Sequence, residues 1–204
     1  MSTVIESGSH STFPAAQSVS SEKELPGDLA VWFFILAELT VFAIFFIAYS
    51  WMHTQNSEMF SAGQATLHPI AGLINTVSLI TSSYVVALAM IAAREGNRKR
   101  CQQGLMLAVL IAGVYVVSKL WEYNLLIEAG YDLSTNTFYM FYFFMTGFHF
   151  MHVLLGMVVL VIFVFCLQNE SYLNENFASV EAGACYWHMV DLLWIILFPL
   201  IYVI

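Results

Sequence analysis

Five long apolar segments constrain this chain more than any other feature of its sequence. Each has roughly the 20 residues or more that an α-helix needs to cross about 30 Å of hydrocarbon. Lipid offers the backbone no hydrogen-bonding partner, so such segments span a membrane as helices. Of the 204 residues, 60% are hydrophobic and 10% are charged, whereas soluble domains carry about 25% charged residues. The sequence therefore predicts an all-α, polytopic membrane protein, a bundle of five transmembrane helices covering approximately residues 29–51, 70–93, 104–127, 138–167 and 184–204.

The rest of the chain divides into a tail and short connections. Residues 1–26 are polar and serine-rich, without the apolar core of a cleaved secretory signal. We expect them to form a flexible cytoplasmic tail, followed by one five-helix membrane domain over residues 27–204. The three cysteines have no paired spacing, which argues against a disulfide framework. The formal net charge of -8 comes from scattered acids, so it does not indicate a nucleic-acid partner.

The basic residues predict the orientation. Arg94, Arg98, Lys99 and Arg100 crowd the connection between the second and third segments, and Lys23 lies in the tail. By the positive-inside rule, the N-terminus is cytoplasmic and the C-terminus is outside. We interpret the basic cluster as this topology signal rather than as a site for nucleic acid or a lipid headgroup.

Ionisable residues inside the predicted spans carry the functional information, because a bilayer makes such groups expensive. They are Glu38, Lys119, Glu122, His149, His152, His188 and Asp191. Lys119 and Glu122 are three residues apart in the outer third of one span, so they share a helix face and can neutralise each other.

The depth of the other five follows from the predicted segment ends. Glu38, His149 and His152 lie near the membrane midplane. His188 and Asp191 lie within about two turns of the cytoplasmic end.

A metal or haem is one interpretation of the histidines. His149 and His152 share a helix face and could supply two ligands, and His149 with His188 could hold a haem. A structural zinc needs four ligands, and a redox copper needs soft or additional imidazole ligands. A haem-copper centre would need about six membrane histidines, twice the number in these spans. We therefore predict no metal ligands, no cofactor and no catalytic residues in this chain.

Proton movement and structural pairing are the two other interpretations. Burial disfavours the charged form of a midplane carboxylate, and a neutral Glu38 beside a histidine could pass protons as in transporters. The same residues could instead hold the bundle together, with His149 and His152 bonded to neighbours such as Glu38 or Glu122. We favour the structural interpretation.

Small and weakly polar residues form a stripe on the second segment. They recur at helical spacings, which lets helices approach closely in lipid: Ala71, Asn75, Ser78, Ser82 and Ala89. We assign Gly147 and Gly156 of the fourth segment the same packing role.

Several stretches resemble subunit III of the haem-copper respiratory oxidases. They are "VWFFILAELTVFAIFF", "LINTVSLITSSYVVALAM", "VYVVSKLWEYNLLI", "TGFHFMHVLLG" and "YWHMVDLLWIILFPLIYV", in the family's order and at similar spacings. In this resemblance Glu38 matches the membrane glutamate that reacts with carbodiimide, and Glu122 with Tyr123 matches the family's "EY". The resemblance implies a helical subunit without haem or copper that packs beside catalytic subunit I. The partner would carry haem and copper or iron, and this chain would bind phospholipid, support proton uptake and protect the partner during turnover.

The chain departs from the seven-helix form of that family, whose first two helices it lacks together with one wall of the lipid-binding cleft. Five-helix members occur as subunit III of bacterial cytochrome o quinol oxidases and as the accessory protein encoded with nitric oxide reductase. The short tail, which is not His-rich, leans toward the second type, and both imply a multi-pass protein of the bacterial plasma membrane. A stand-alone proton-coupled transporter and a small membrane cytochrome are the alternatives from other functional classes.

Overall fold

The secondary structure of this chain is helical throughout the part that can be described. The computed structural model describes residues 29–169, 172 and 177–204, so the predicted tail of residues 1–26 lies outside it. The helices are α1 (Leu29–Gln55), α2 (Ser57–Gln64), α3 (Pro69–Arg94), α4 (Arg98–Glu128), α5 (Thr137–Cys166) and α7 (Phe177–Tyr202).

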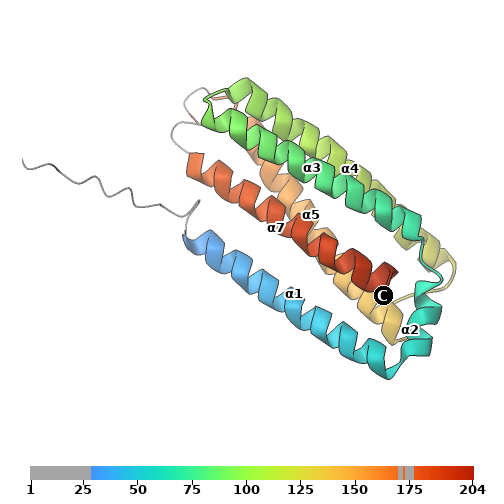
Figure 1. The fold of residues 1–204 in the computed structure, drawn as a ribbon. Helices are drawn as coiled ribbons and strands as arrows, with labels where there is room; N and C mark the ends of the chain where they lie inside the picture. The colour runs from blue at the N-terminus through green and yellow to red at the C-terminus, as the bar shows by residue number, and fades with distance from the viewer. Residues whose placement is uncertain (1–28, 170–171, 173–176) are drawn as a thin grey trace, which may run out of the picture.

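Five of these helices are long and apolar enough to cross a membrane, which confirms the predicted bundle of five spans. They run side by side along one bundle axis, with α2 at the end where α1 finishes (Figure 1). The start of α1, the α3–α4 connection and the start of α7 lie together at the opposite end (Figure 1). The most extensive helix pair is the α3–α4 hairpin.

Local side-chain bonds fix where two of the spans begin. The Asn97 side chain accepts a hydrogen bond from the backbone N–H of Arg100 at 3.2 Å, and the Asn136 side chain accepts one from the N–H of Tyr139 at 3.1 Å. Both are N-caps, which satisfy donors that a helix start leaves free. Gly96 has a φ of 71°, a conformation that favours glycine, and it lets α3 turn directly into α4.

The connection between α4 and α5 is held by a small polar turn. The carboxylate of Asp132 accepts hydrogen bonds from the side chain and backbone N–H of Ser134 and from the hydroxyl of Thr135. These bonds favour the charged carboxylate, so they hold its pKa below the usual value.

Two spans begin earlier than the hydropathy pattern predicts. α4 begins at Arg98 and α7 at Phe177, six and seven residues before the predicted starts. Hydropathy marks the apolar part of a helix, whereas the helix itself continues into polar residues. As a result, His188 and Asp191 lie eleven and fourteen residues from the start of α7, about three to four turns rather than two.

The short helix α2 was not predicted from sequence. It has eight residues and a mixed composition, with Phe60 and Gly63 buried. The ring of Phe60 packs against Tyr49 and His53 of α1 and against Phe138 of α5, at centroid distances of 5.2, 5.4 and 5.6 Å. Tertiary packing on one aromatic residue therefore stabilises a segment too short to be a stable helix alone.

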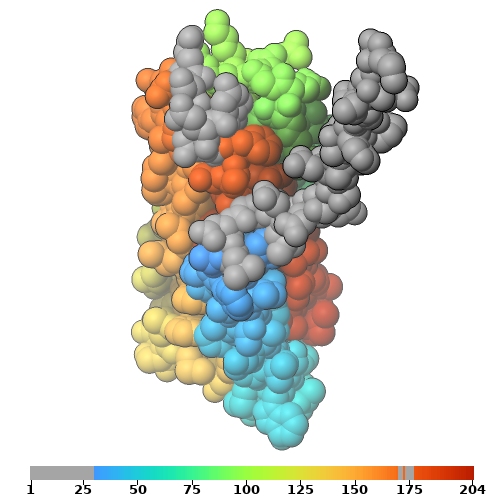
Figure 2. Space-filling view, turned by 90° about the vertical axis from the view of Figure 1, so that its left-hand side faces the viewer, coloured from blue at the N-terminus to red at the C-terminus, as the bar shows by residue number. Residues whose placement is uncertain are grey.

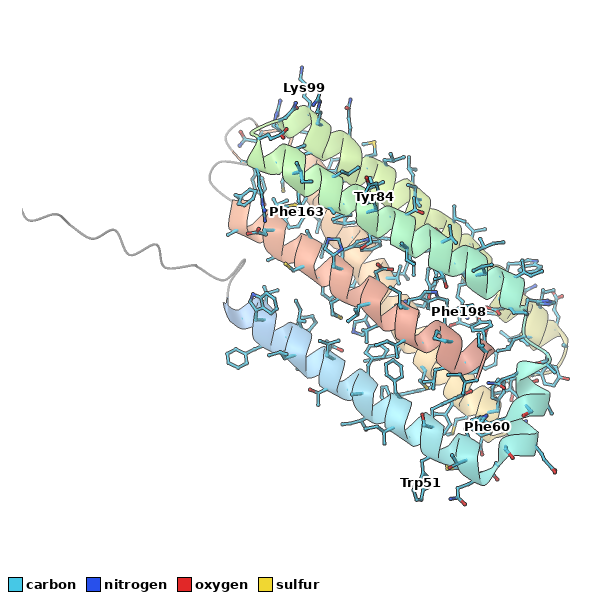
Figure 3. All side chains as sticks on the ribbon, viewed as in Figure 1. Trp51, Phe60, Tyr84, Lys99, Phe163 and Phe198 are labelled. Carbon is cyan, nitrogen blue, oxygen red and sulfur yellow. The ribbon has the colours of Figure 1, made fainter. Side chains whose placement is uncertain are left out.

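α1 lies at the edge of the bundle, against α5 and α7 (Figure 2). Ile35, Phe42 and Tyr49 are its buried residues, one every seven positions. This spacing gives a single narrow seam toward the bundle. The face of α1 away from the bundle is exposed, as for Trp51, which points away from the other helices (Figure 3).

The polar stripe of α3 faces α4. Ser78 donates a hydrogen bond to the carbonyl oxygen of Ile111 at 2.7 Å, and Ser82 donates one to that of Ala108 at 2.8 Å. Asn75 is fully buried on the same face. These bonds give the two helices a fixed register.

The two glycines of α5 differ in their surroundings. A Cβ added at Gly156 would lie 2.8 Å from Cε3 of Trp187 on α7, whereas a Cβ at Gly147 would have no atom within 4 Å. Gly156 therefore lies at a close contact between helices. Gly147 does not, because it is half-exposed and the space beside it is open.

These surroundings predict opposite effects of one substitution. Gly156→Ala should lower the free energy of unfolding in detergent micelles by about 1 kcal/mol, since the added methyl group overpacks the α5–α7 contact. Gly147→Ala is the matched comparison and should raise it by about 0.5 to 1 kcal/mol, since the new methyl group meets open space and alanine favours a helix interior over glycine. Equal effects of the two variants in a denaturant titration would contradict this account of the α5–α7 interface.

Candidate functional site

The ionisable residues predicted inside the spans separate into distinct places in the bundle. Glu122, His149 and His152 are buried, whereas Glu38, His188 and Asp191 are half-buried. The difference in burial follows from the positions of the helices. Glu38 belongs to α1, which lies at the edge of the bundle, and the side of α7 that carries His188 lies near the surface of the bundle.

The first place joins α1 to α5 through Glu38 and His152. Nδ1 of His152 lies 2.7 Å from the carbonyl oxygen of Phe148, so Nδ1 carries the hydrogen and donates. Nε2 lies 3.0 Å from Oε2 of Glu38. The pair is therefore either a carboxylic acid that donates to a neutral imidazole or a carboxylate that accepts from an imidazolium, and one proton transfer interconverts the two.

The surroundings of this pair are aromatic but not sealed. The rings of Phe42 and Phe148 lie 5.5 and 4.7 Å from the His152 ring. The side chain of Glu38 is 20% exposed and that of His152 is 9% exposed. The carboxyl group therefore lies close to the bundle surface, where a proton donor or acceptor outside this chain could approach it.

The second place is a closed cage around Lys119. Its ammonium donates hydrogen bonds to Oε2 of Glu122 at 2.8 Å, to the hydroxyl of Tyr142 at 3.0 Å and to that of Tyr202 at 2.8 Å. An ammonium has three N–H donors, so each has an acceptor. Trp194 adds a further contact, with its ring 5.6 Å from the Lys119 nitrogen.

The glutamate of this cage is equally well bonded. The hydroxyl of Tyr202 donates to both carboxylate oxygens of Glu122, at 2.8 and 2.7 Å. Lys119 and Glu122 are both fully buried. Three helices, α4, α5 and α7, therefore meet at one ion pair. The pairing within α4 follows the predicted spacing, but the tyrosines were missed, although buried tyrosine hydroxyls usually require a partner.

His149 does not take the partner that we expected. It is fully buried, and neither ring nitrogen has a hydrogen-bonding partner among the described residues. Its ring lies 5.9 Å from that of Tyr115, 5.2 Å from that of Trp194 and 6.4 Å from that of Phe42. His149 is thus packed as an aromatic ring at the centre of the bundle.

The third place lies between α7 and the middle of α3. Nδ1 of His188 is 2.6 Å from the hydroxyl of Ser83, a residue that sequence reasoning missed. Oδ1 of Asp191, one turn further along, is buried and has no hydrogen-bonding partner among the described residues. Trp194 follows, and its indole N–H donates to the Thr76 hydroxyl at 3.0 Å. Polar bonds therefore connect α7 to α3 over two turns.

The basic residues at the α3–α4 connection have specific partners. Arg94 forms a 2.6 Å ion pair with Glu181 at the start of α7. Arg98 donates hydrogen bonds to the carbonyl oxygens of Leu167 and Gln168, at 2.9 and 2.6 Å. Two of the four predicted topology residues therefore also connect helix ends.

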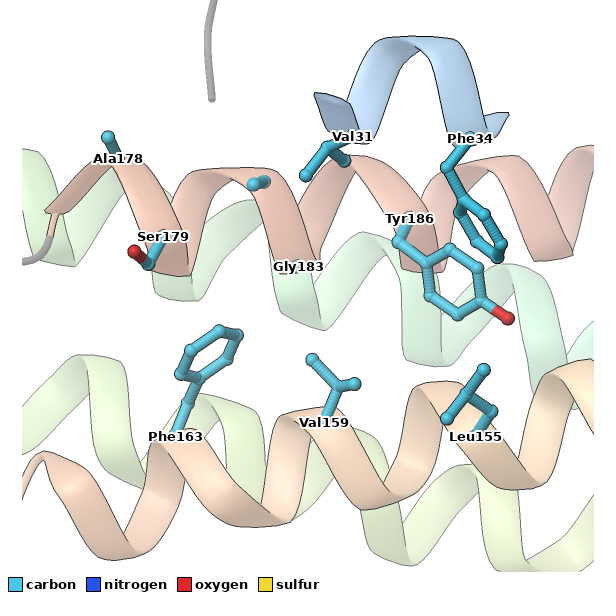
Figure 4. A pocket seen from close by; sticks show the side chains of 10 residues that line it. Val31, Phe34, Leu155, Val159, Phe163, Ala178, Ser179, Gly183 and Tyr186 are labelled. Carbon is cyan, nitrogen blue, oxygen red and sulfur yellow. The ribbon is translucent and has the colours of Figure 1, made fainter. Parts of the chain in front are cut away.

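An apolar groove opens between α1, α5 and α7 beside this end of the bundle (Figure 4). It measures about 490 Å³, and Phe34 of α1, Phe163 of α5 and Tyr186 of α7 are among its lining residues. In the described ranges, histidines, cysteines and acids form no group of three or more placed to hold a metal ion.

Known proteins share these features of sequence. Residues 8–204 match the family described as Cytochrome c oxidase subunit III. Similar proteins are named cytochrome c oxidase subunit 3. That of Heterololigo bleekeri is 31% identical over 175 residues, 83% of this chain and 66% of that protein. That of Thermostichus vulcanus is 28% identical over 177 residues, 86% of each. That of Drosophila melanogaster is 30% identical over 177 residues, which are 83% of this chain and 66% of that protein.

The chain thus spans about two thirds of the length of most of these relatives, but most of the length of the Thermostichus vulcanus protein. The match includes every stretch on which the resemblance rests, from Val31 in α1 to Val203 directly after α7. This chain is a multi-pass membrane protein that belongs to the cytochrome c oxidase subunit III family of the haem-copper oxidases.

Proposed function

We propose that this chain is a non-catalytic subunit III that assembles with the catalytic subunit of a haem-copper respiratory oxidase. The family match over residues 8–204 carries the proposal. The interior supports it, because the buried ionisable groups Lys119 and Glu122 bond to each other and to tyrosines of the bundle. Such bonds join helices, which is what an assembly subunit requires.

The proposal places the haem and the copper or iron in the catalytic subunit, and the complex in a bacterial plasma membrane. The bacterial location rests on the five-span form that the resemblance assigns to bacterial oxidases. Phospholipid binding is part of the same proposal, and the groove of about 490 Å³ beside Phe34, Phe163 and Tyr186 has the apolar lining that an acyl chain requires.

We infer that the pair of Glu38 and His152 supports proton uptake by the catalytic subunit. The two atoms that would share a proton, Nε2 of His152 and Oε2 of Glu38, lie 3.0 Å apart. The partial exposure of Glu38 makes the pair accessible to groups beyond this chain. In this proposal α1 packs between the rest of the bundle and the catalytic subunit. That contact would support assembly and would protect the catalytic subunit during turnover.

Co-purification tests this function. We expect an affinity-tagged chain, extracted from native membranes in a mild detergent, to bring down a haem-containing catalytic subunit in equal amount. Deleting the chain should leave the haem spectrum of that subunit intact and lower its yield or sustained turnover. The activity of the purified complex distinguishes its three possible types. An oxidase reduces oxygen with either cytochrome c or quinol, whereas reduction of nitric oxide would indicate the nitric oxide reductase accessory role.

Two outcomes would overturn the proposal. A chain that purifies alone with stoichiometric haem would be a cytochrome. A chain that purifies alone and drives proton-coupled uptake into liposomes would be a transporter.

The proposed orientation makes a separate prediction. With the basic connection of residues 94–100 on the cytoplasmic side, the C-terminus after α7 should lie outside. A phosphatase fused after Ile204 should be active and a fluorescent protein fused there should be dark. The reverse pattern would show that the positive-inside rule fails for this chain.

A further inference from the structure

A shallow groove runs along the outer seam of α3 and α4, beside the connection between them. It measures about 350 Å³, and its walls include Leu88, Ile91 and Leu107. Two charged residues, Glu95 and Arg100, also line it. The groove is therefore apolar along its length and carries one negative and one positive charge at the end of the helix pair.

These two charges differ from Arg94 and Arg98, and from Lys99 in that they line the groove. Arg94 is paired with Glu181, and Arg98 donates to backbone carbonyls. The side chains of Glu95 and Arg100 are exposed, and the structure gives neither a hydrogen bond nor an ion pair to another described residue. An acid and a base thus line the same groove without neutralising each other.

The apolar surface of this seam continues along α3 and α4, away from Glu95 and Arg100. A second groove, of about 390 Å³, is lined by Thr81, Ile111 and Val114 on the same two helices. It begins one helical turn beyond the first, since Thr81 and Ile111 lie four residues from Val85 and Leu107. From Arg100 to Ile111 the rise is about 16 Å, roughly half of a 30 Å hydrocarbon core. The path therefore matches one acyl chain of one leaflet.

We propose that this seam binds one phospholipid whose headgroup carries both a phosphate and a primary ammonium, which is the chemistry of phosphatidylethanolamine. The guanidinium of Arg100 would bind the phosphate, since arginine suits planar recognition of phosphate oxygens. The carboxylate of Glu95 would accept a hydrogen bond from the ammonium, and an acyl chain would lie along α3 and α4. This site uses α3 and α4 alone and is separate from the groove beside α1.

Headgroup charge argues for this lipid over the other common ones. Phosphatidylglycerol brings only negative charge, so it would leave the carboxylate of Glu95 beside a second anion. The trimethylated ammonium of phosphatidylcholine has no N–H to donate to Glu95. A transmembrane helix of a partner subunit could fill the apolar walls, but it would need an acid and a base of its own, placed at the right depth, to pair with Arg100 and Glu95.

Native mass spectrometry of the purified full chain in detergent tests the proposal. The probe is an equimolar mixture of phosphatidylethanolamine, phosphatidylglycerol and phosphatidylcholine with identical acyl chains. We expect phosphatidylethanolamine adducts to exceed those of either other lipid about fivefold, the factor for one charge contact at a membrane surface. Glu95→Gln should remove that excess, because Glu95 is the residue that binds the ammonium, and Arg100→Gln should lower the adducts of all three lipids, because each of them carries a phosphate.

Lys99 provides the matched control. It lies at the tip of the α3–α4 connection and points away from the bundle (Figure 3), and it does not line the groove. Lys99→Gln should therefore leave both the amount of bound lipid and the preference among the three lipids unchanged. If the two test variants fold poorly, Arg100→Lys and Glu95→Asp keep each charge and should keep the preference.

Three results would overturn the site. Equal adducts of the three lipids in the wild-type chain would indicate annular lipid only, and a preference for phosphatidylglycerol would indicate general attraction to the basic residues. In the intact complex, a photo-crosslinker at Leu107 should react with lipid, and its reaction with another subunit would show that a protein helix occupies the seam.

Discussion

Glu122→Gln should lower the free energy of unfolding of this chain by about 3 to 5 kcal/mol, the usual cost of removing one partner from a buried ion pair. Lys119 is fully buried, and its ammonium has no other anion among its three hydrogen-bonding partners, Glu122, Tyr142 and Tyr202. The substitution would leave that charge uncompensated in lipid. Unfolding in mixed micelles, followed by tryptophan fluorescence, measures the loss.

A double variant distinguishes the effect of the buried charge on stability from the effect of side-chain shape in the cage around Lys119. Lys119→Met with Glu122→Gln removes both charges and keeps an acceptor for the hydroxyl of Tyr202. It should be more stable than Glu122→Gln alone, because an apolar replacement of a buried pair is often neutral or stabilising. Glu128→Gln, at the exposed end of the same helix, is the control and should change stability by less than about 0.5 kcal/mol. A double variant that is no more stable than Glu122→Gln alone would contradict the ion-pair explanation.

The spans and the pairing of Lys119 with Glu122 were predictable because both depend on local sequence. A span is a run of apolar residues of fixed length, and a pair three positions apart on one helix needs no knowledge of its neighbours. The tyrosines that bond to Lys119 could not be predicted from local sequence. Tyr142 and Tyr202 reach Lys119 from two other helices, 23 and 83 positions away in sequence. No local pattern marks which of the chain's tyrosines do so.

The partner of Glu38 could not be chosen from sequence for a related reason. His149 and His152 lie on one face of α5, about 60° apart around the helix and about 4.5 Å apart along it. Which of them meets Glu38 depends on the height and rotation of α1, and those are set by the seam of Ile35, Phe42 and Tyr49. The structure selects His152.

The basic residues of the α3–α4 connection show a further limit of prediction from sequence. Its positive charge predicts an orientation, and that prediction treats Arg94, Arg98 and Arg100 as equivalent. The structure distinguishes them, because Arg94 pairs with Glu181, Arg98 caps the end of α5 through carbonyl oxygens, and Arg100 lines a groove. These roles depend on which helix ends lie together, and hydropathy contains no such information.

The two histidines of α5 should respond oppositely to the same substitution. His152→Phe should lower the free energy of unfolding by about 1 to 2 kcal/mol, because it leaves the carboxyl group of Glu38 without its partner. His149→Phe should leave stability unchanged or raise it by about 1 kcal/mol. The ring nitrogens of His149 have no partner among the described residues, and burying unpartnered polar atoms is unfavourable. Unfolding of both variants in the same micelles provides the comparison.

A second substitution shows whether the loss at His152 arises from the pair. Glu38→Leu in the His152→Phe background removes the carboxyl group that the first change leaves alone, so it should restore most of the lost stability. In the wild-type background Glu38→Leu should cost about as much as His152→Phe, because each breaks the same 3.0 Å contact between α1 and α5. A loss with His149→Phe as large as that with His152→Phe would mean that His149 has a polar partner in the membrane, and the aromatic role assigned to it here would be wrong. Opposite signs for the two variants would assign the hydrogen bond between α1 and α5 to His152 and the aromatic packing at the centre of the bundle to His149.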